Sequence, residues 1–141
     1  MPDVGGLNST CLNTLLTLQH EARLGIPAVV HAVWDSPKWA PKAQGLDSLE
    51  FSLAAFLVAA GEYQYFVYGP ANSWRLRNGA GRDFLLFEEY KKRLGAPHGL
   101  AVRDGGSHSD GAGGTQFTRR FEHAQVWCDV ATRKANITWL R

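Results

Sequence analysis

The sequence predicts an α/β fold in which βα units are followed by a short antiparallel β-meander. Three observations support this prediction. Apolar residues recur at helical spacing near the start of the chain, continuous apolar runs of strand length follow at 26–34 and 63–68, and three short strand-like runs lie after residue 115. The expected order of elements is therefore α, β, α, β, α and then β, β, β.

Composition and charge narrow the class of protein. With 45% hydrophobic and 20% charged residues, the 141-residue chain is expected to be globular, and it is too short for a complete eight-unit α/β barrel, which needs about 200 residues or more. The net charge of +2 is scattered, which argues against nucleic acid as a partner. The longest apolar run, 51–60, is about half a membrane span, and the first residues lack the basic start of a signal peptide. We expect a soluble protein in a compartment that the sequence does not define.

The first helix and the first strand are predicted from the residues around position 25. Leucines recur at helical spacing from Cys11 onward, Ser9 or Thr10 can cap the helix, and Gly25 follows its end. The run 26–34 is β-branched at its centre and apolar at successive positions, which is typical of a buried parallel strand.

The second helix is expected to begin at Asp47 and Glu50, which have capping-box spacing, and to end near Gly61. Its apolar residues cover nearly every side, a pattern that a helix on the surface of a small domain would not tolerate. We therefore expect other elements to cover this helix from more than one direction.

The remaining elements are a strand, a helix and a meander. The strand 63–68 ends at Gly69, and a third helix is expected from Asp83 to Gly95, with Glu88/Lys92 and Glu89/Arg93 as outward i,i+4 pairs. A glycine-rich stretch at 104–114 is expected to form a mobile loop. The runs 116–121, 124–130 and 135–140 then predict the meander, in which one of Arg119 and Arg120 faces inward to a carboxylate and the other faces solvent.

Two parallel strands alone do not make a sheet with a protected interior. Either the meander supplies the missing neighbours, or the chain is the end of a larger unit, or it self-associates through exposed sheet edges. We favour the larger unit because of an ordered set of residues that includes 53–61, Tyr63, 65–66, Tyr90, Leu94-Gly95-x-Pro97-x-Gly99, 117–121, Val126 and Asp129.

With these residues the chain resembles a largely uncharacterised family of glycoside hydrolases with a TIM-barrel fold, found in bacteria and algae. The resemblance implies that the chain is the C-terminal third of such an enzyme. It would contain the last βα units of a (β/α)8 TIM-type barrel in residues 1–99, a glycine-rich loop at 100–115 and an antiparallel β-meander at 116–141, so that the barrel is incomplete. The implied reaction is hydrolysis of an O-glycosyl bond in a carbohydrate, with no metal or organic cofactor.

Candidate site residues follow the two predicted strands, because barrel active sites lie at the C-terminal ends of the strands. Asp35 is a candidate acid, base or hydroxyl acceptor, although Asp35-Ser36-Pro37 also fits a simple turn. Candidate substrate-binding residues combine aromatic faces with short polar groups, which suit sugar rings and hydroxyls, and these are Trp34, Trp39, Tyr68, Asn72, Trp74 and Arg75. The tryptophans can equally cap the rim of the barrel.

The chemistry of hydrolysis needs two carboxyl groups flanking one sugar bond, and only Asp35 stands directly at a predicted strand exit. The five histidines show no metal-ligand spacing, and Cys11 and Cys128 form neither a disulfide framework nor a metal-binding pair. We therefore expect no hydrolysis by the chain on its own. The alternatives are a small non-catalytic carbohydrate- or protein-binding α/β domain, closed by its meander or by self-association, and a truncated gene product.

Overall fold

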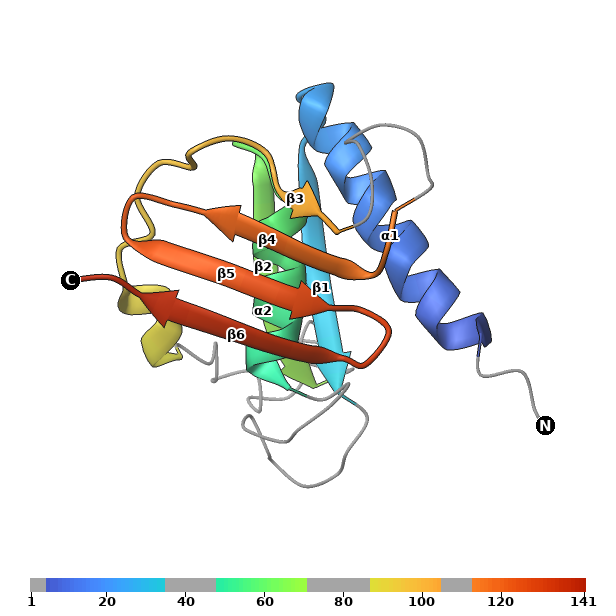
Figure 1. Cartoon of the computed structure of the whole chain (residues 1–141). Helices are drawn as coiled ribbons and strands as arrows, with labels where there is room; N and C mark the ends of the chain where they lie inside the picture. Colours follow the sequence, from blue (N-terminus) through green and yellow to red (C-terminus); the bar gives the residue numbers. More distant parts are fainter. Residues whose placement is uncertain (1–4, 35–47, 71–86, 105–112) are drawn as a thin grey trace, which may run out of the picture.

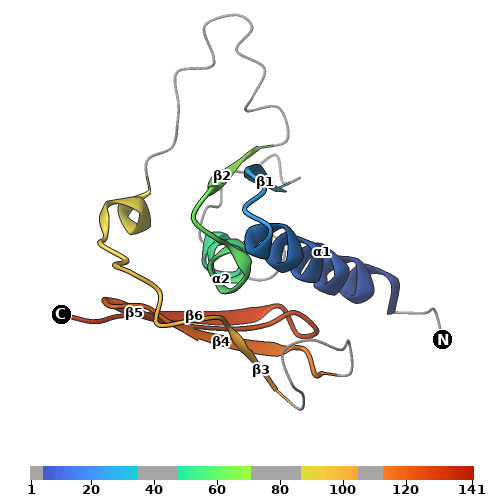
Figure 2. The ribbon, with the colours of Figure 1, turned by 90° about the horizontal axis from the view of Figure 1, so that it is seen from above.

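The computed structural model describes residues 5–34, 48–70, 87–104 and 113–141, which form three layers. A two-stranded parallel sheet, β1 and β2, forms one outer layer, and a four-stranded antiparallel sheet in the order β3-β4-β5-β6 forms the other. The two α-helices lie between the sheets (Figures 1 and 2). In chain order the elements are α1 (Gly5–Arg23), β1 (Ala28–Trp34), α2 (Leu49–Ala59), β2 (Gln64–Pro70), the 3₁₀ helix η2 (Glu88–Lys91), β3 (Val102–Arg103), β4 (Gln116–Arg120), β5 (Ala124–Asp129) and β6 (Lys134–Trp139).

This architecture shows that the predicted TIM-type barrel segment is wrong. The described residues contain two α-helices and two small sheets, one of two parallel strands and one of four antiparallel strands. In a barrel the helices form an outer ring around one parallel sheet. Here α2 instead packs against the strands of both sheets, β2 on one side and β4, β5 and β6 on the other (Figure 2).

Helix α2 is covered from more than one direction, as its apolar pattern predicted. Its buried residues occupy almost the whole helix and are Leu49, Phe51, Leu53, Ala54, Phe56, Leu57, Val58 and Ala59. The predicted capping box is wrong in detail: Ser48 is the N-cap and its hydroxyl accepts from the Phe51 amide at 3.2 Å. Glu50 Oε1 accepts from the Ile137 amide of β6 at 3.2 Å, so this side chain ties α2 to the antiparallel sheet.

Helix α1 begins earlier than predicted, because Ser9 and Thr10 lie within it. Its end matches the prediction: Gly25 has a φ of +69°, and the amides of Gly25 and Ile26 donate to the carbonyls of Ala22 and Glu21. This is the Schellman arrangement, in which a glycine adopts the left-handed conformation just after a helix.

Strands β1 and β2 pair in parallel, as predicted, with Val29 opposite Tyr65 and His31 opposite Val67. The alternate residues of each strand, such as Val30 and Phe66, pack against the core that α2 helps to form. The other face leaves Val29 68% exposed and Tyr65 59% exposed, so the prediction of a buried strand is wrong for this face of β1.

The third predicted helix is wrong in the part that the structure describes. From residue 87 onward the chain forms only the short 3₁₀ helix η2, and an ion pair of 2.6 Å joins Lys91 to Glu88 instead of the predicted i,i+4 pairs. In a 3₁₀ turn the side chains at i and i+3 eclipse one another. The rings of Phe87 and Tyr90 meet at 5.5 Å and reach Tyr68 and Phe66 of β2, respectively.

The antiparallel meander is confirmed and gains one short strand, β3, that the sequence did not predict. The buried face of this sheet packs on α2 through Phe117, Val126, Cys128 and Ile137, which join one core cluster with residues of α1 and α2. Residues 105–112, most of the predicted glycine-rich loop, lie outside the described residues. Within the described ranges, neither α-helix is long and apolar enough to cross a membrane.

Candidate functional site

The structure brings together the two strand ends from which the candidate site residues were predicted. Ala32 lies opposite Tyr68, and Trp34 ends β1 opposite Pro70, so both strands finish at the same edge of the parallel sheet. Asp35, Trp39, Asn72, Trp74 and Arg75 all lie outside the described residues. Only Tyr68 among the predicted site residues has a described side chain.

Tyr68 belongs to an aromatic cluster beneath the end of the parallel sheet. It is 4% exposed and packs with Leu49. Its ring lies 6.5 Å from that of Phe66 and 5.6 Å from that of Phe87. Burial raises the pKa of neighbouring Tyr90 to about 12. The ring of Tyr68 therefore contributes to the core.

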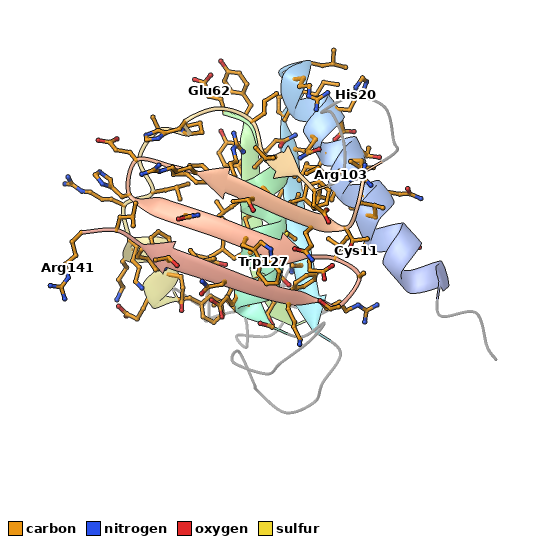
Figure 3. All side chains as sticks on the ribbon, viewed as in Figure 1. Cys11, His20, Glu62, Arg103, Trp127 and Arg141 are labelled. Carbon is orange, nitrogen blue, oxygen red and sulfur yellow. The ribbon has the colours of Figure 1, made fainter. Side chains whose placement is uncertain are left out.

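A second candidate surface is the outer face of the four-stranded sheet, which we call the outer sheet face. The register aligns Val102, Thr118, Trp127 and Asn136 in one row across β3 to β6. Because side chains alternate between the two faces of a strand, this row lies opposite the buried core residues. Trp127 is half-buried at the centre of the face, and both described α-helices lie behind the sheet on its other side (Figures 1 and 3).

Polar side chains surround Trp127 on the outer sheet face. A neighbouring row aligns Arg120, Gln125 and Thr138, all exposed. The indole Nε1 donates to Gln116 Oε1 at 3.4 Å, and Asn136 Nδ2 donates to Thr138 Oγ1 at 3.2 Å. The face thus combines one flat aromatic ring with amide and hydroxyl groups that both donate and accept hydrogen bonds.

The sequence contained a signal for this face that the interpretation did not use. Ala124, Val126 and Cys128 alternate as the inward residues of β5, and Trp127 falls between them. A tryptophan out of phase with a buried set is expected on the opposite face of its strand. The prediction instead concentrated on the strand ends of the parallel sheet, because the resemblance placed the active face there.

Asp129 is the buried carboxylate of the sheet, and it stabilises a turn. Its Oδ1 accepts from Thr115 Oγ1 at 2.8 Å and from the Ala131 amide at 3.0 Å, while Oδ2 accepts from Thr132 Oγ1 at 2.8 Å. Burial opposes ionisation of Asp129, but these hydrogen bonds outweigh burial and lower its pKa. The carboxylate is thus ionised and engaged between β5 and β6.

The described residues provide no cluster of three histidine, cysteine, aspartate or glutamate side chains that could hold a metal ion. No protein-family model and no curated protein matches the chain. The resemblance to glycoside hydrolases therefore remains a prediction from the sequence.

Proposed function

We propose that the chain is a non-catalytic carbohydrate-binding domain that holds a neutral saccharide on its outer sheet face. The observation that carries this proposal is the position of Trp127, at the centre of the face and flanked in register by Thr118 and Asn136. An indole ring offers a flat apolar surface to the CH face of a sugar, and its strand neighbours lie about 5 Å to each side.

Apart from Arg120, the polar groups that surround Trp127 on the face are uncharged amides and hydroxyls, which suit sugar hydroxyls. The amides of Gln116, Gln125 and Asn136 and the hydroxyls of Thr118 and Thr138 are each both donor and acceptor, as sugar hydroxyls are. A β-sheet also holds these side chains on a rigid scaffold, which reduces the entropy lost on binding.

The test is a titration of the purified chain with neutral oligosaccharides, namely cello-, xylo-, laminari-, malto- and manno-oligosaccharides, followed by tryptophan fluorescence and calorimetry. We expect saturable binding that Trp127→Ala abolishes and that does not depend on salt, because the ligand is uncharged. Trp39→Ala and Trp74→Ala are matched controls at two residues that the sequence predicted to bind substrate.

Three results would contradict the proposal. Binding that survives Trp127→Ala but is lost in Trp39→Ala or Trp74→Ala would place the sugar at the predicted strand ends. A steep fall of affinity for single-stranded RNA with salt, together with no sugar binding, would indicate a nucleic-acid surface instead. No binding by any member of the panel would remove the support for a carbohydrate ligand.

A second property is favoured by the parallel sheet. We propose that the chain self-associates through β1 and β2, because each strand pairs with one neighbour only within the described residues and their outer face exposes Val29 and Tyr65. Unpaired edges and exposed apolar faces promote association. Sedimentation should show an oligomer, and Val29→Lys should convert it to a monomer. The control Thr138→Lys, on the outer sheet face, should leave the oligomer unchanged. A wild-type protein that is monomeric at all concentrations would refute this property.

A further inference from the structure

A cavity of about 90 Å³ lies where both helices meet the antiparallel sheet. Its walls come from the C-terminal half of α1, the C-terminal end of α2, the segment before β3, and β4. The apolar walls include Ala22, Val58, Leu100 and Ala101, and the polar groups are Gln19, Arg23 and Arg119. A water molecule needs roughly 10 to 15 Å³ of such volume, so the cavity holds a ligand of about six to nine non-hydrogen atoms.

Arg119 is the buried cation of this cavity, with 7% of its surface exposed. Its Nη1 donates to the carbonyls of Leu57 at 2.9 Å and Ala60 at 2.6 Å, and its Nε donates to the Gly99 carbonyl at 3.1 Å. These bonds use three of the five N–H groups of the guanidinium. Within the described residues Nη2 donates no hydrogen bond.

The Nη2 group of Arg119 is not fully buried. In the described part of the chain, Arg133 Nε is the side-chain nitrogen or oxygen that is fully buried and lacks a hydrogen-bond partner. Arg119 Nη2 lacks a partner too but does not meet this criterion, so it is not fully enclosed by protein. Arg119 is one of the residues that line the cavity. We infer that the two remaining N–H groups of Arg119 are the donors that a ligand in the cavity would meet.

The charged side chains among the described lining residues of the cavity are Arg23 and Arg119. No aspartate or glutamate of the described residues lines it, whereas Arg23 joins Arg119 in the wall. The C-terminal end of α2 offsets about half a unit of this charge through its carbonyls. Burial also lowers the pKa of Arg119.

We propose that this cavity binds a small aliphatic monocarboxylate, with the carboxylate on Arg119 Nη2 and the hydrocarbon against the walls formed by Ala22, Val58 and Leu100. The size of the cavity matches a chain of about four carbons. The apolar walls favour a monocarboxylate over inorganic phosphate, since phosphate would lose its hydration there without compensation. This site is separate from the outer sheet face and does not depend on the proposed sugar binding.

The experiment titrates the full chain with sodium butyrate at constant ionic strength and follows backbone amides by NMR. We expect saturable shifts at Gln19, Gly61 and Ala101, weaker binding of acetate, and no binding of butyramide, which has the same shape without the charge. Arg23→Glu changes an exposed residue at the cavity wall and should weaken butyrate binding about tenfold by charge repulsion. Arg141→Glu makes the same change at the C-terminus, away from the cavity, and should leave the affinity unchanged.

The proposal is overturned if butyrate shifts these amides no more than chloride does, if butyramide binds as tightly as butyrate, or if phosphate binds more tightly than butyrate. Equal loss of affinity in Arg23→Glu and Arg141→Glu would also overturn it, because the effect would then come from net charge alone. Neither arginine variant alters Arg119, so the test does not depend on a change in the buried core.

Discussion

Replacing Arg119 by methionine should destabilise the protein strongly, because Arg119 joins three separate segments. Its guanidinium bonds to the carbonyls of Leu57, Ala60 and Gly99 and lies 5.0 Å over the ring of Phe121. Methionine keeps most of the aliphatic volume, so the loss falls mainly on the hydrogen bonds. A hydrogen bond to a charged group contributes about 1.5 to 3 kcal/mol, and breaking a buried charged network costs about 3 to 5 kcal/mol.

The matched control is Arg120→Met at the next position of β4, where the side chain is exposed on the other face of the sheet. Urea unfolding of the two variants should show a loss of about 4 kcal/mol for Arg119→Met and a change within about 0.5 kcal/mol for Arg120→Met. A domain of this size is stable by about 5 to 15 kcal/mol, so the first loss is large. A loss below about 1 kcal/mol for Arg119→Met, with an unchanged slope against urea, would refute the structural role assigned to its hydrogen bonds.

Two further predictions concern single side chains, and a third concerns catalysis. Burial raises the pKa of Cys128 to about 12, with smaller contributions from the charges of Cys11 and Asp129. A thiol reagent at pH 8 should therefore label Cys128 only when the protein unfolds. Rapid labelling of the native Cys11→Ser protein would contradict this prediction. The pKa of Asp129 is lowered in the folded state, so its stabilising contribution is complete above the unfolded-state value of about 3.9 and is lost as pH falls through the folded-state value. Asp129→Asn should therefore flatten the loss of stability in acid, and equal slopes for wild type and variant would count against the turn network. Finally, the purified chain should hydrolyse no member of a polysaccharide panel, whereas robust, mutation-sensitive hydrolysis would restore the enzymatic prediction.

Local structure was largely predictable from local patterns. Gly25 ends α1 because a glycine just past a helix accepts positive φ, and the β-branched run after it forms a parallel strand with β2. The antiparallel strands followed from their short alternating runs, and the all-round apolar surface of α2 correctly indicated cover on more than one side. Each of these predictions depends on the residues of one element.

The errors arose where contacts between elements decide the structure. The segment that includes Phe87 and Tyr90 has helical spacing, yet Phe87 is the extended N-cap of the short 3₁₀ helix η2, which contains Tyr90. This conformation places the ring of Phe87 against Tyr68 and the ring of Tyr90 against Phe66. One of Arg119 and Arg120 was expected to face inward to a carboxylate. Arg119 is the inward residue, but its hydrogen-bond partners are backbone carbonyls rather than a carboxylate. A sequence pattern indicates that a charged side chain is buried, but it does not indicate which groups accept its hydrogen bonds.

The barrel prediction failed because the apolar surface of α2 does not identify the elements that cover it. The inward residues of the meander, including Phe117, Val126 and Ile137, form a one-sided apolar face that also needs a partner. Helix α2 buries one side against this face of the meander and the other side toward β2. The apolar surfaces of α2 and of the meander therefore bury each other within the chain. Barrel units are then unnecessary to explain the cover of α2. Within the described residues, two surfaces stay unpaired: the apolar outer face of β1 and β2, and the polar outer sheet face around Trp127. These two differ in chemistry, which is why we assign self-association to the first and saccharide binding to the second.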